Sequence, residues 1–162
     1  MPTSAPRIGH GFDLHRLVEG RDLVLANVNI PSDRGCDAHS DGDVVLHALT
    51  DAILGALAQQ DIGQLFPDND PQWKDADSAV FLQEAIERMT TAGYTLGNAD
   101  LTVILQAPKL SPHKLAMLVR LAELLGCETS QVNLKAKTHE RVDALGQSQA
   151  VACHAVVLLL PV

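Results

Sequence analysis

The segment "AVACHAVVLLL" at residues 150–160 is almost entirely apolar, and it constrains the fold more than any other stretch. An apolar run without alternating polar positions predicts a strand that is covered on both faces. A sheet built around this strand therefore needs cover on both sides. In a chain of only 162 residues, another subunit could supply part of that cover.

The remaining periodic segments are predicted to alternate between strands and helices. Strands are predicted over residues 7–15, 22–30, 98–106 and 131–138, and helices over 40–58, 77–93 and 111–126. This order predicts an α+β fold, in which helices cover one face of a mixed β-sheet. We expect one domain spanning residues 1–162, with residues 1–6 flexible.

The first helix carries both a core stripe and polar positions. Ser40 is predicted to cap it, and Asp43 three residues later resembles the second half of a capping box. Asp43, His47 and Asp51 follow one another at four-residue spacing, on a face separate from the apolar stripe. That stripe consists of Leu46, Leu49, Ile53 and Leu57.

Composition narrows the classes of function. The formal net charge of −8 argues against nonspecific binding to nucleic acid or anionic membranes, although a bound cation would still permit a phosphorylated substrate. The odd cysteine count without a C-x-x-C pair favours reduced thiols. The start "MPTSAPR" lacks the apolar stretch of a signal peptide, so we expect a soluble cytoplasmic protein.

The stretch "GHGFDLH" contains the first candidate for metal chemistry. Asp13 and His15 project from the same face of a regular strand, and one oxygen with one nitrogen ligand suits Zn²⁺. His47 is the best candidate for a third ligand, which would leave a position open for substrate. The alternative is an ordinary solvated strand face beside a solvated helix face.

Two polar loops are candidates for ligand binding. In "DAHSDGD", His39 could donate to a phosphate at a helix start, although a simple helix cap explains the same loop. In "DIGQLFPDND", Asp61, Gly63, Phe66 and Asp68 could surround a polyol, or the loop could be merely acidic and solvated.

Later in the chain, polar residues follow two predicted strands. Lys109 could lie beside a phosphate, and Glu140 near Thr138 could hold a hard cation such as Mg²⁺, although such residues are more often ordinary surface residues. The sequence contains neither a P-loop motif nor the G-x-S-x-G motif of a nucleophile elbow.

Four stretches taken together resemble the 2-C-methyl-D-erythritol 2,4-cyclodiphosphate synthase family: "RIGHGFDLH", "AHSDGDVVLHALTDAILGALAQQDIGQLFPD", "GYTLGNADLTVILQAPKL" and "VNLKAKTHE". The resemblance runs from about residue 7 to the end of the chain. It implies a homotrimer with active sites between subunits. One subunit would supply the metal and erythritol side, and its neighbour would supply much of the cytidine side.

The resemblance also implies roles for particular residues. Asp13, His15 and His47 match the zinc ligands, and Glu140 matches the ligand of a second cation, Mg²⁺ or Mn²⁺. His39 and Thr138 match residues that stabilise the transition state. The implied substrate-binding set is Asp13, His15, His39, Ser40, Asp61, Ile62, Gly63, Phe66, Pro67, Asp68, Leu105, Gln106, Ala107, Pro108, Lys109, Leu110, Ser111, Lys137, Thr138, His139 and Glu140.

The implied activity is that of a phosphorus-oxygen lyase in the non-mevalonate isoprenoid pathway. It converts 4-diphosphocytidyl-2-C-methyl-D-erythritol 2-phosphate to 2-C-methyl-D-erythritol 2,4-cyclodiphosphate and CMP, through attack of the 2-phosphate on the β-phosphate. The alternatives are a divalent-metal phosphohydrolase and a non-enzymatic trimeric protein that binds a nucleotide or an isoprenoid. Ala144 and Gln147 stand where many members have an aromatic residue and an arginine, which weakens the expectation of an isoprenoid diphosphate in the central trimer cavity.

Overall fold

A computed structural model describes residues 5–162; residues 1–4, part of the segment predicted to be flexible, lie outside the described residues. The described chain forms a five-stranded sheet in the order β4-β1-β7-β5-β6. All neighbouring strands are antiparallel except β5 and β6, which are parallel, so the sheet is mixed as predicted. The strands are β1 (Arg7–Glu19), β4 (Arg34–Asp37), β5 (Tyr94–Ile104), β6 (Val132–Lys137) and β7 (Ala150–Pro161).

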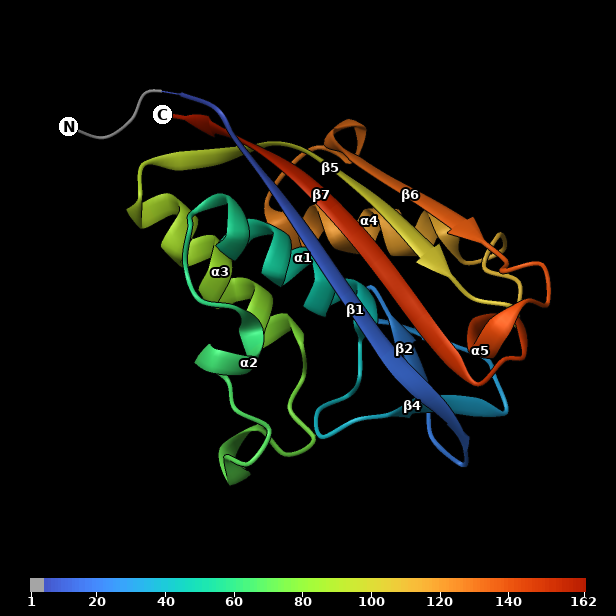
Figure 1. The fold of residues 1–162 in the computed structure, drawn as a ribbon. Coiled ribbons are helices and arrows are strands. Elements are labelled where there is room, and N and C mark those ends of the chain that lie inside the picture. Colours follow the sequence, from blue (N-terminus) through green and yellow to red (C-terminus); the bar gives the residue numbers. More distant parts are fainter. Residues whose placement is uncertain (1–4) are drawn as a thin grey trace.

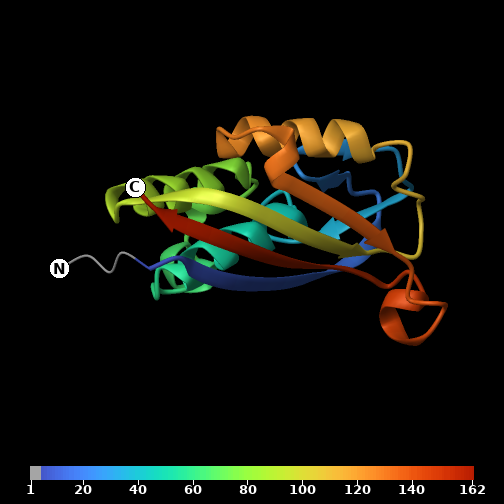
Figure 2. The same ribbon diagram turned by 90° about the horizontal axis from the view of Figure 1, so that it is seen from above.

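Three long helices lie on one side of this sheet (Figures 1 and 2). Helix α1 packs against β1 and β7, α3 packs against α1, and α4 packs against β6. This arrangement fits the predicted α+β domain. The helices are α1 (Val44–Ala56), α3 (Ala79–Thr91) and α4 (Lys114–Leu125), with the short α2 (Ile62–Leu65), η1 (Pro71–Trp73), η2 (Thr129–Gln131) and α5 (Asp143–Gly146).

Several predicted boundaries are wrong. The segment predicted as one strand over residues 22–30 is a hairpin of β2 (Leu23–Leu25) and β3 (Val28–Ile30). Its turn places Ala26 and Asn27 at φ values of 55° and 57°, which ends the first strand sharply. The segments at 31–39 and 61–76, which lie outside every predicted strand and helix, contain β4 and the short helices α2 and η1, respectively.

Two glycines of β1 let α1 lie directly on the strand. A methyl group built on Gly11 would lie 1.9 Å from the carbonyl oxygen of Ala48, and one on Gly9 would lie 1.8 Å from that of Ala52. Any side chain at these positions would therefore push the helix away. Because strand residues alternate between faces, Asp13 points to the same helix-facing side as these glycines.

The opposite side of the sheet is apolar but uncovered in the single chain. Val151, Cys153 and Val157 on the helix side of β7 are fully buried, whereas His154 and Val156 between them are exposed. We call the exposed apolar residues on this side the outer face; they are Ile8, Phe12, Leu14, Val156 and Leu160. The predicted double cover of this strand is thus present on one face only.

Two histidines lie together on the outer face. The Nε2 atom of His10 lies 3.1 Å from the Nδ1 atom of His154, and the ring of Phe12 stacks beside His154 at 4.7 Å between centroids.

Among residues 5–162, no helix combines the length and apolar character that crossing a membrane requires.

The close contact between β1 and α1 makes a stability prediction. Gly11→Ala should lower the free energy of unfolding by about 1–3 kcal/mol, because its methyl group collides with helix backbone that cannot move aside freely. Thermal unfolding followed by circular dichroism measures the effect. Gly55→Ala is the matched control: its methyl group would lie 3.7 Å from the His10 carbonyl oxygen, an ordinary contact, so it should leave stability unchanged or raise it. Equal melting temperatures for Gly11→Ala and wild type would contradict the explanation.

Candidate functional site

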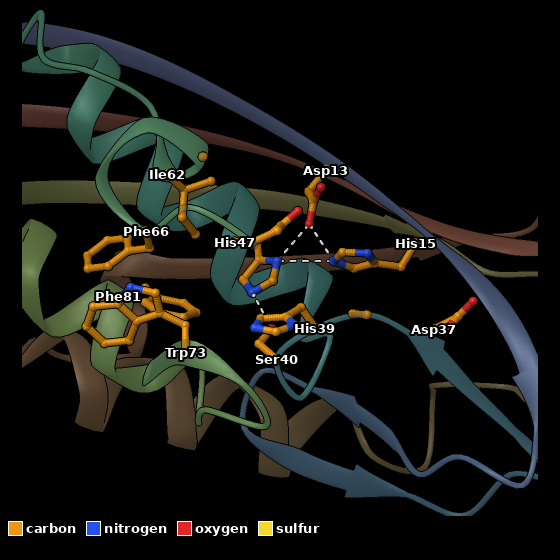
Figure 3. A pocket seen from close by; sticks show the side chains of 13 residues that line it. Asp13, His15, Asp37, His39, Ser40, His47, Ile62, Phe66, Trp73 and Phe81 are labelled. Carbon is orange, nitrogen blue, oxygen red and sulfur yellow. Dashed lines mark hydrogen bonds and ion pairs between the residues drawn. The ribbon is translucent and has the colours of Figure 1, made fainter. Parts of the chain in front are cut away.

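Three potential metal ligands meet between β1 and α1 (Figure 3). The Oδ2 atom of Asp13 lies 2.9 Å from both the Nε2 atom of His15 and the Nδ1 atom of His47. The two imidazole nitrogens are 3.1 Å apart. The strand contributes two ligands because residues 13 and 15 share its helix side, and α1 contributes the third from its first turns.

This donor set fits a divalent metal ion. Donor atoms separated by about 3 Å can all reach an ion at the bond lengths of about 2.0–2.2 Å that zinc prefers. Three protein ligands also leave a fourth position open, as in catalytic rather than structural zinc sites. The predicted trio is therefore brought together in a geometry that could hold a metal.

The three side chains also influence one another's ionisation. Burial raises the pKa of Asp13, but hydrogen bonds to His15 and His47 outweigh burial and hold that pKa well below its usual range. Burial lowers the pKa of His47, yet the neighbouring Asp13 carboxylate raises it above the usual value. The cluster thus keeps a negatively charged ligand in a largely buried position.

A pocket of about 510 Å³ opens beside the cluster. Nine of the predicted site residues line it, from both the metal group and the two polar loops. Sequence reasoning missed Asp37, Ala38, Trp73 and Phe81; Phe81 was interpreted only as part of a helix. The lining residues are Asp13, His15, Asp37, Ala38, His39, Ser40, His47, Ile62, Gly63, Phe66, Asp68, Trp73 and Phe81.

One wall of the pocket is aromatic, and short capped elements hold it in place. The ring of Phe66 packs against those of Phe81 and Trp73, at 4.6 and 5.2 Å between centroids. Asp61 accepts a hydrogen bond from Gln64 N and so caps α2. Asp61 and Pro67 were predicted to contact substrate, but neither is among the residues that line this pocket.

The loop before α1 is built around Asp43 rather than Ser40. Asp43, not Ser40 as predicted, is the N-cap, and it accepts hydrogen bonds from the backbone N–H groups of Val45 and Leu46. The same carboxylate accepts the N–H groups of Ala26 and Asn27 at 3.0 and 2.6 Å. One fully buried carboxylate therefore joins the helix start to the β2–β3 hairpin.

Ser40 has a different environment. Its hydroxyl oxygen accepts the Gly42 N–H and lies 3.4 Å from the Nε2 atom of His47. His39, beside it, lines the pocket.

Burial raises the pKa of Asp43 to about 6, although the hydrogen bonds that its carboxylate accepts from backbone N–H groups favour the charged form.

The predicted substrate-binding residues at positions 105–111 and 137–140 form a second group, away from this pocket. They follow the ends of the parallel strands β5 and β6, where Leu105 N donates to the carbonyl oxygen of Lys137 at 2.9 Å. The side-chain oxygen of Gln106 accepts the N–H groups of His139 and Arg141. The group comprises Leu105, Gln106, Ala107, Pro108, Lys109, Leu110, Ser111, Lys137, Thr138, His139 and Glu140, none of which lines the metal pocket.

Burial limits what this second group can offer a ligand. Leu105 and Leu110 are buried in the core, so their side chains are not available to a ligand. Thr138 and Glu140 are exposed and lie close to each other, with 3.5 Å between the hydroxyl and the carboxylate oxygen. Within one chain, the predicted site is thus divided into two separate halves.

A family comparison matches residues 6–160 to the model described as the YgbB family. The chain belongs to the YgbB family. Among similar members, the chloroplastic 2-C-methyl-D-erythritol 2,4-cyclodiphosphate synthase of Oryza sativa subsp. japonica is 60% identical, over 98% of this chain and 72% of that protein. The enzyme of that name from Cronobacter sakazakii is 54% identical, over 95% of this chain and 97% of that protein.

Solved structures of family members share the fold. A 2C-methyl-D-erythritol-2,4-cyclodiphosphate synthase described as a CDP-bound form matches with a TM-score of 0.88 and 46% identity, covering 94% of this chain and 99% of that one. The bifunctional IspDF of Campylobacter jejuni matches with a TM-score of 0.93 and 40% identity. This chain covers 43% of the bifunctional protein. The resemblance inferred from the four sequence stretches is confirmed.

The double anchoring role of Asp43 predicts that an amide cannot replace it. Asp43→Asn should lower the free energy of unfolding by about 1–3 kcal/mol, because its NH₂ group would face a backbone N–H that now has no acceptor. Chemical denaturation measures the change. Asp61→Asn is the control, since that exposed cap accepts a single N–H and should cost less. Equal effects of the two variants would contradict the role assigned to Asp43.

Proposed function

We propose that the chain is a 2-C-methyl-D-erythritol 2,4-cyclodiphosphate synthase, a phosphorus-oxygen lyase that releases CMP from 4-diphosphocytidyl-2-C-methyl-D-erythritol 2-phosphate. The observation that carries this proposal is the Asp13–His15–His47 triangle at the mouth of a pocket, in a chain of the YgbB family. The names of its relatives support the same reaction. A cytoplasmic location is part of the proposal, although some of these relatives are chloroplastic.

The proposed substrate carries both the nucleophile and the leaving group. Its 2-phosphate attacks the β-phosphorus, a new P–O bond forms, and the bond to the α-phosphate oxygen breaks as CMP leaves. No protein nucleophile is required, so the protein contributes mainly positioning and charge stabilisation. Asp13, His15 and His47 would hold Zn²⁺, and Glu140 a Mg²⁺ or Mn²⁺ ion; such ions supply the positive charge that brings phosphates together.

The remaining pocket residues would bind and orient the substrate. His39 would donate a hydrogen bond to a phosphate oxygen, and Thr138 would do so from the cytidine side. Asp68 would accept hydrogen bonds from erythritol hydroxyls, and the backbone of Ile62 and Gly63 lies along the same wall. The aromatic wall beside Phe66 would exclude water from the activated β-phosphate, which favours cyclisation over hydrolysis.

Two features support a homotrimer with active sites between subunits. The metal pocket and the second group of predicted residues, at 105–111 and 137–140, are separate in one chain, so a complete site would require the second group of a neighbour. The outer face is also apolar, and exposed apolar residues of this kind mark interfaces. The CDP-bound relative supports a cytidine nucleotide as part of the ligand.

Phosphorus NMR of the cytidine diphosphate substrate tests the function. Protein supplied with Zn²⁺ and Mg²⁺ should produce CMP and a cyclic diphosphate. An open-chain phosphate product would overturn the proposal in favour of a phosphohydrolase, and no turnover would overturn it in favour of a binding protein.

The zinc ligands make a sharper prediction. His47→Ala should abolish both zinc content and turnover, because two remaining ligands bind the ion far more weakly. Elemental analysis and the phosphorus assay measure these losses, and circular dichroism should show an unchanged fold. Thr90→Ala is the control, because its exposed side chain bonds only Ile86 O on α3 and does not line the pocket. Full activity of His47→Ala would show that the site lies elsewhere.

The trimer is tested by placing a charge on the outer face. Phe12→Asp should yield monomers or dimers in light scattering, because a carboxylate would be buried without a partner in the assembly. Leu115→Asp is the matched control: Leu115 is more exposed than Phe12 but lies on α4, on the helix side of the sheet. A Phe12→Asp protein with the trimer's mass would exclude the outer face as the interface.

A further inference from the structure

The imidazole of His47 has two different sides. Its Nδ1 atom faces Asp13 and His15, as described above. Its Nε2 atom points away from them and lies 2.8 Å from the hydroxyl oxygen of Ser78. His47 is only 8% exposed, so water cannot replace this partner freely.

Ser78 is fully buried, and its side chain does not cap the helix that it precedes. Its hydroxyl instead donates to Asp41 Oδ1, and its backbone N–H donates to Asp41 Oδ2 at 3.1 Å. Both donors of Ser78 are therefore directed at one carboxylate. The predicted site set includes neither residue: Asp41 lies in the loop "DAHSDGD" but was given no role, and Ser78 lies in no recognisable ligand pattern.

The number of available protons determines which group donates in each hydrogen bond between His47, Ser78 and Asp41. A serine hydroxyl has one proton, and the Asp41 carboxylate takes it. The hydroxyl can then only accept from His47, so Nε2 must carry the hydrogen. Nδ1, which lies 2.9 Å from the Asp13 carboxylate, is then the nitrogen whose proton a metal ion can displace.

We propose that Asp41 and Ser78 are positioning residues, which hold His47 in the orientation and tautomer that present Nδ1 to a metal ion. Partners of this kind on the far nitrogen of a histidine ligand fix the ring and raise its basicity. The inference rests on the proposed metal site, but it concerns a proton that is present without any metal.

The same residues tie the pocket wall to the metal ligand. Ser78 directly follows the loop at residues 61–77, which carries the wall residues Phe66 and Trp73. That loop is fastened to the neighbouring segment by two backbone hydrogen bonds: Asp75 N donates to His39 O at 2.8 Å, and Asp41 N donates to Ala76 O at 3.1 Å. A displacement of the wall would therefore disturb the partner of His47.

The decisive measurement is the tautomer of His47 in metal-free wild-type protein. Long-range ¹H–¹⁵N NMR shows for each ring nitrogen whether it carries hydrogen. The proposal requires hydrogen on Nε2. A ring without hydrogen on Nε2 would overturn it. This result does not depend on catalysis, so it stands apart from a failure of the proposed function.

Variants then test the consequence for metal binding. Ser78→Ala should weaken zinc binding about 10–100-fold in competition with a chelator, and Ser78→Thr, which keeps the hydroxyl, should recover most of it. Thr50→Val is the matched control, because it removes a buried hydroxyl from α1 that bonds Leu46 O and not the ring of His47. Unchanged zinc affinity in Ser78→Ala, or an equal loss in Thr50→Val, would overturn the proposal.

Discussion

The direct contact between β1 and α1 is the constraint on which the site depends. Gly9 and Gly11 let the helix backbone approach the strand to a distance that no side chain would permit. Gly11 packs against the helix backbone at Ala48. His47 directly precedes Ala48, and Asp13 follows Gly11 by two residues on the same side of the strand, so the two ligands lie side by side. The separation of the metal ligands is thus set by backbone packing rather than by the ligands themselves. A larger residue in this strand would move a ligand as well as destabilise the core.

The buried Asp43 provides the second fixed point. It satisfies the open N–H groups at the start of α1 and those of the β2–β3 hairpin turn with the same two oxygens. The segment that carries His39 and Ser40 runs between these fixed elements, so both side chains face the pocket without regular structure of their own. Leaving a buried carboxylate or N–H group unpaired is costly, so the loss of one partner of Asp43 would destabilise both the helix start and the hairpin turn.

Much of the fold could be predicted because the apolar patterns are long and regular. The helices at 40–58 and 77–93 follow from the helical spacing of their apolar residues, and the terminal strand follows from its continuous apolar run. The N-cap was assigned to Ser40 because local rules treat Ser and Asp alike; burial and the hairpin, which decide for Asp43, are tertiary facts. Asp13 and His15 could be paired from spacing alone, whereas Ser78 reaches His47 from 31 residues away and leaves no pattern.

The charges of the pocket explain why an acidic chain can act on an anionic ligand. Three carboxylates, those of Asp13, Asp37 and Asp68, line the pocket, so without cations it would repel a diphosphate. A carboxylate is nevertheless a good acceptor for hydroxyl groups, and as a metal ligand it leaves a divalent ion with net positive charge. Under the proposed function, the acidic lining would therefore recognise the polyol, while bound cations bind the phosphates. Neutral replacements would therefore separate the two interactions, since the loss of Asp13 would weaken ion binding and the loss of Asp68 would weaken polyol binding.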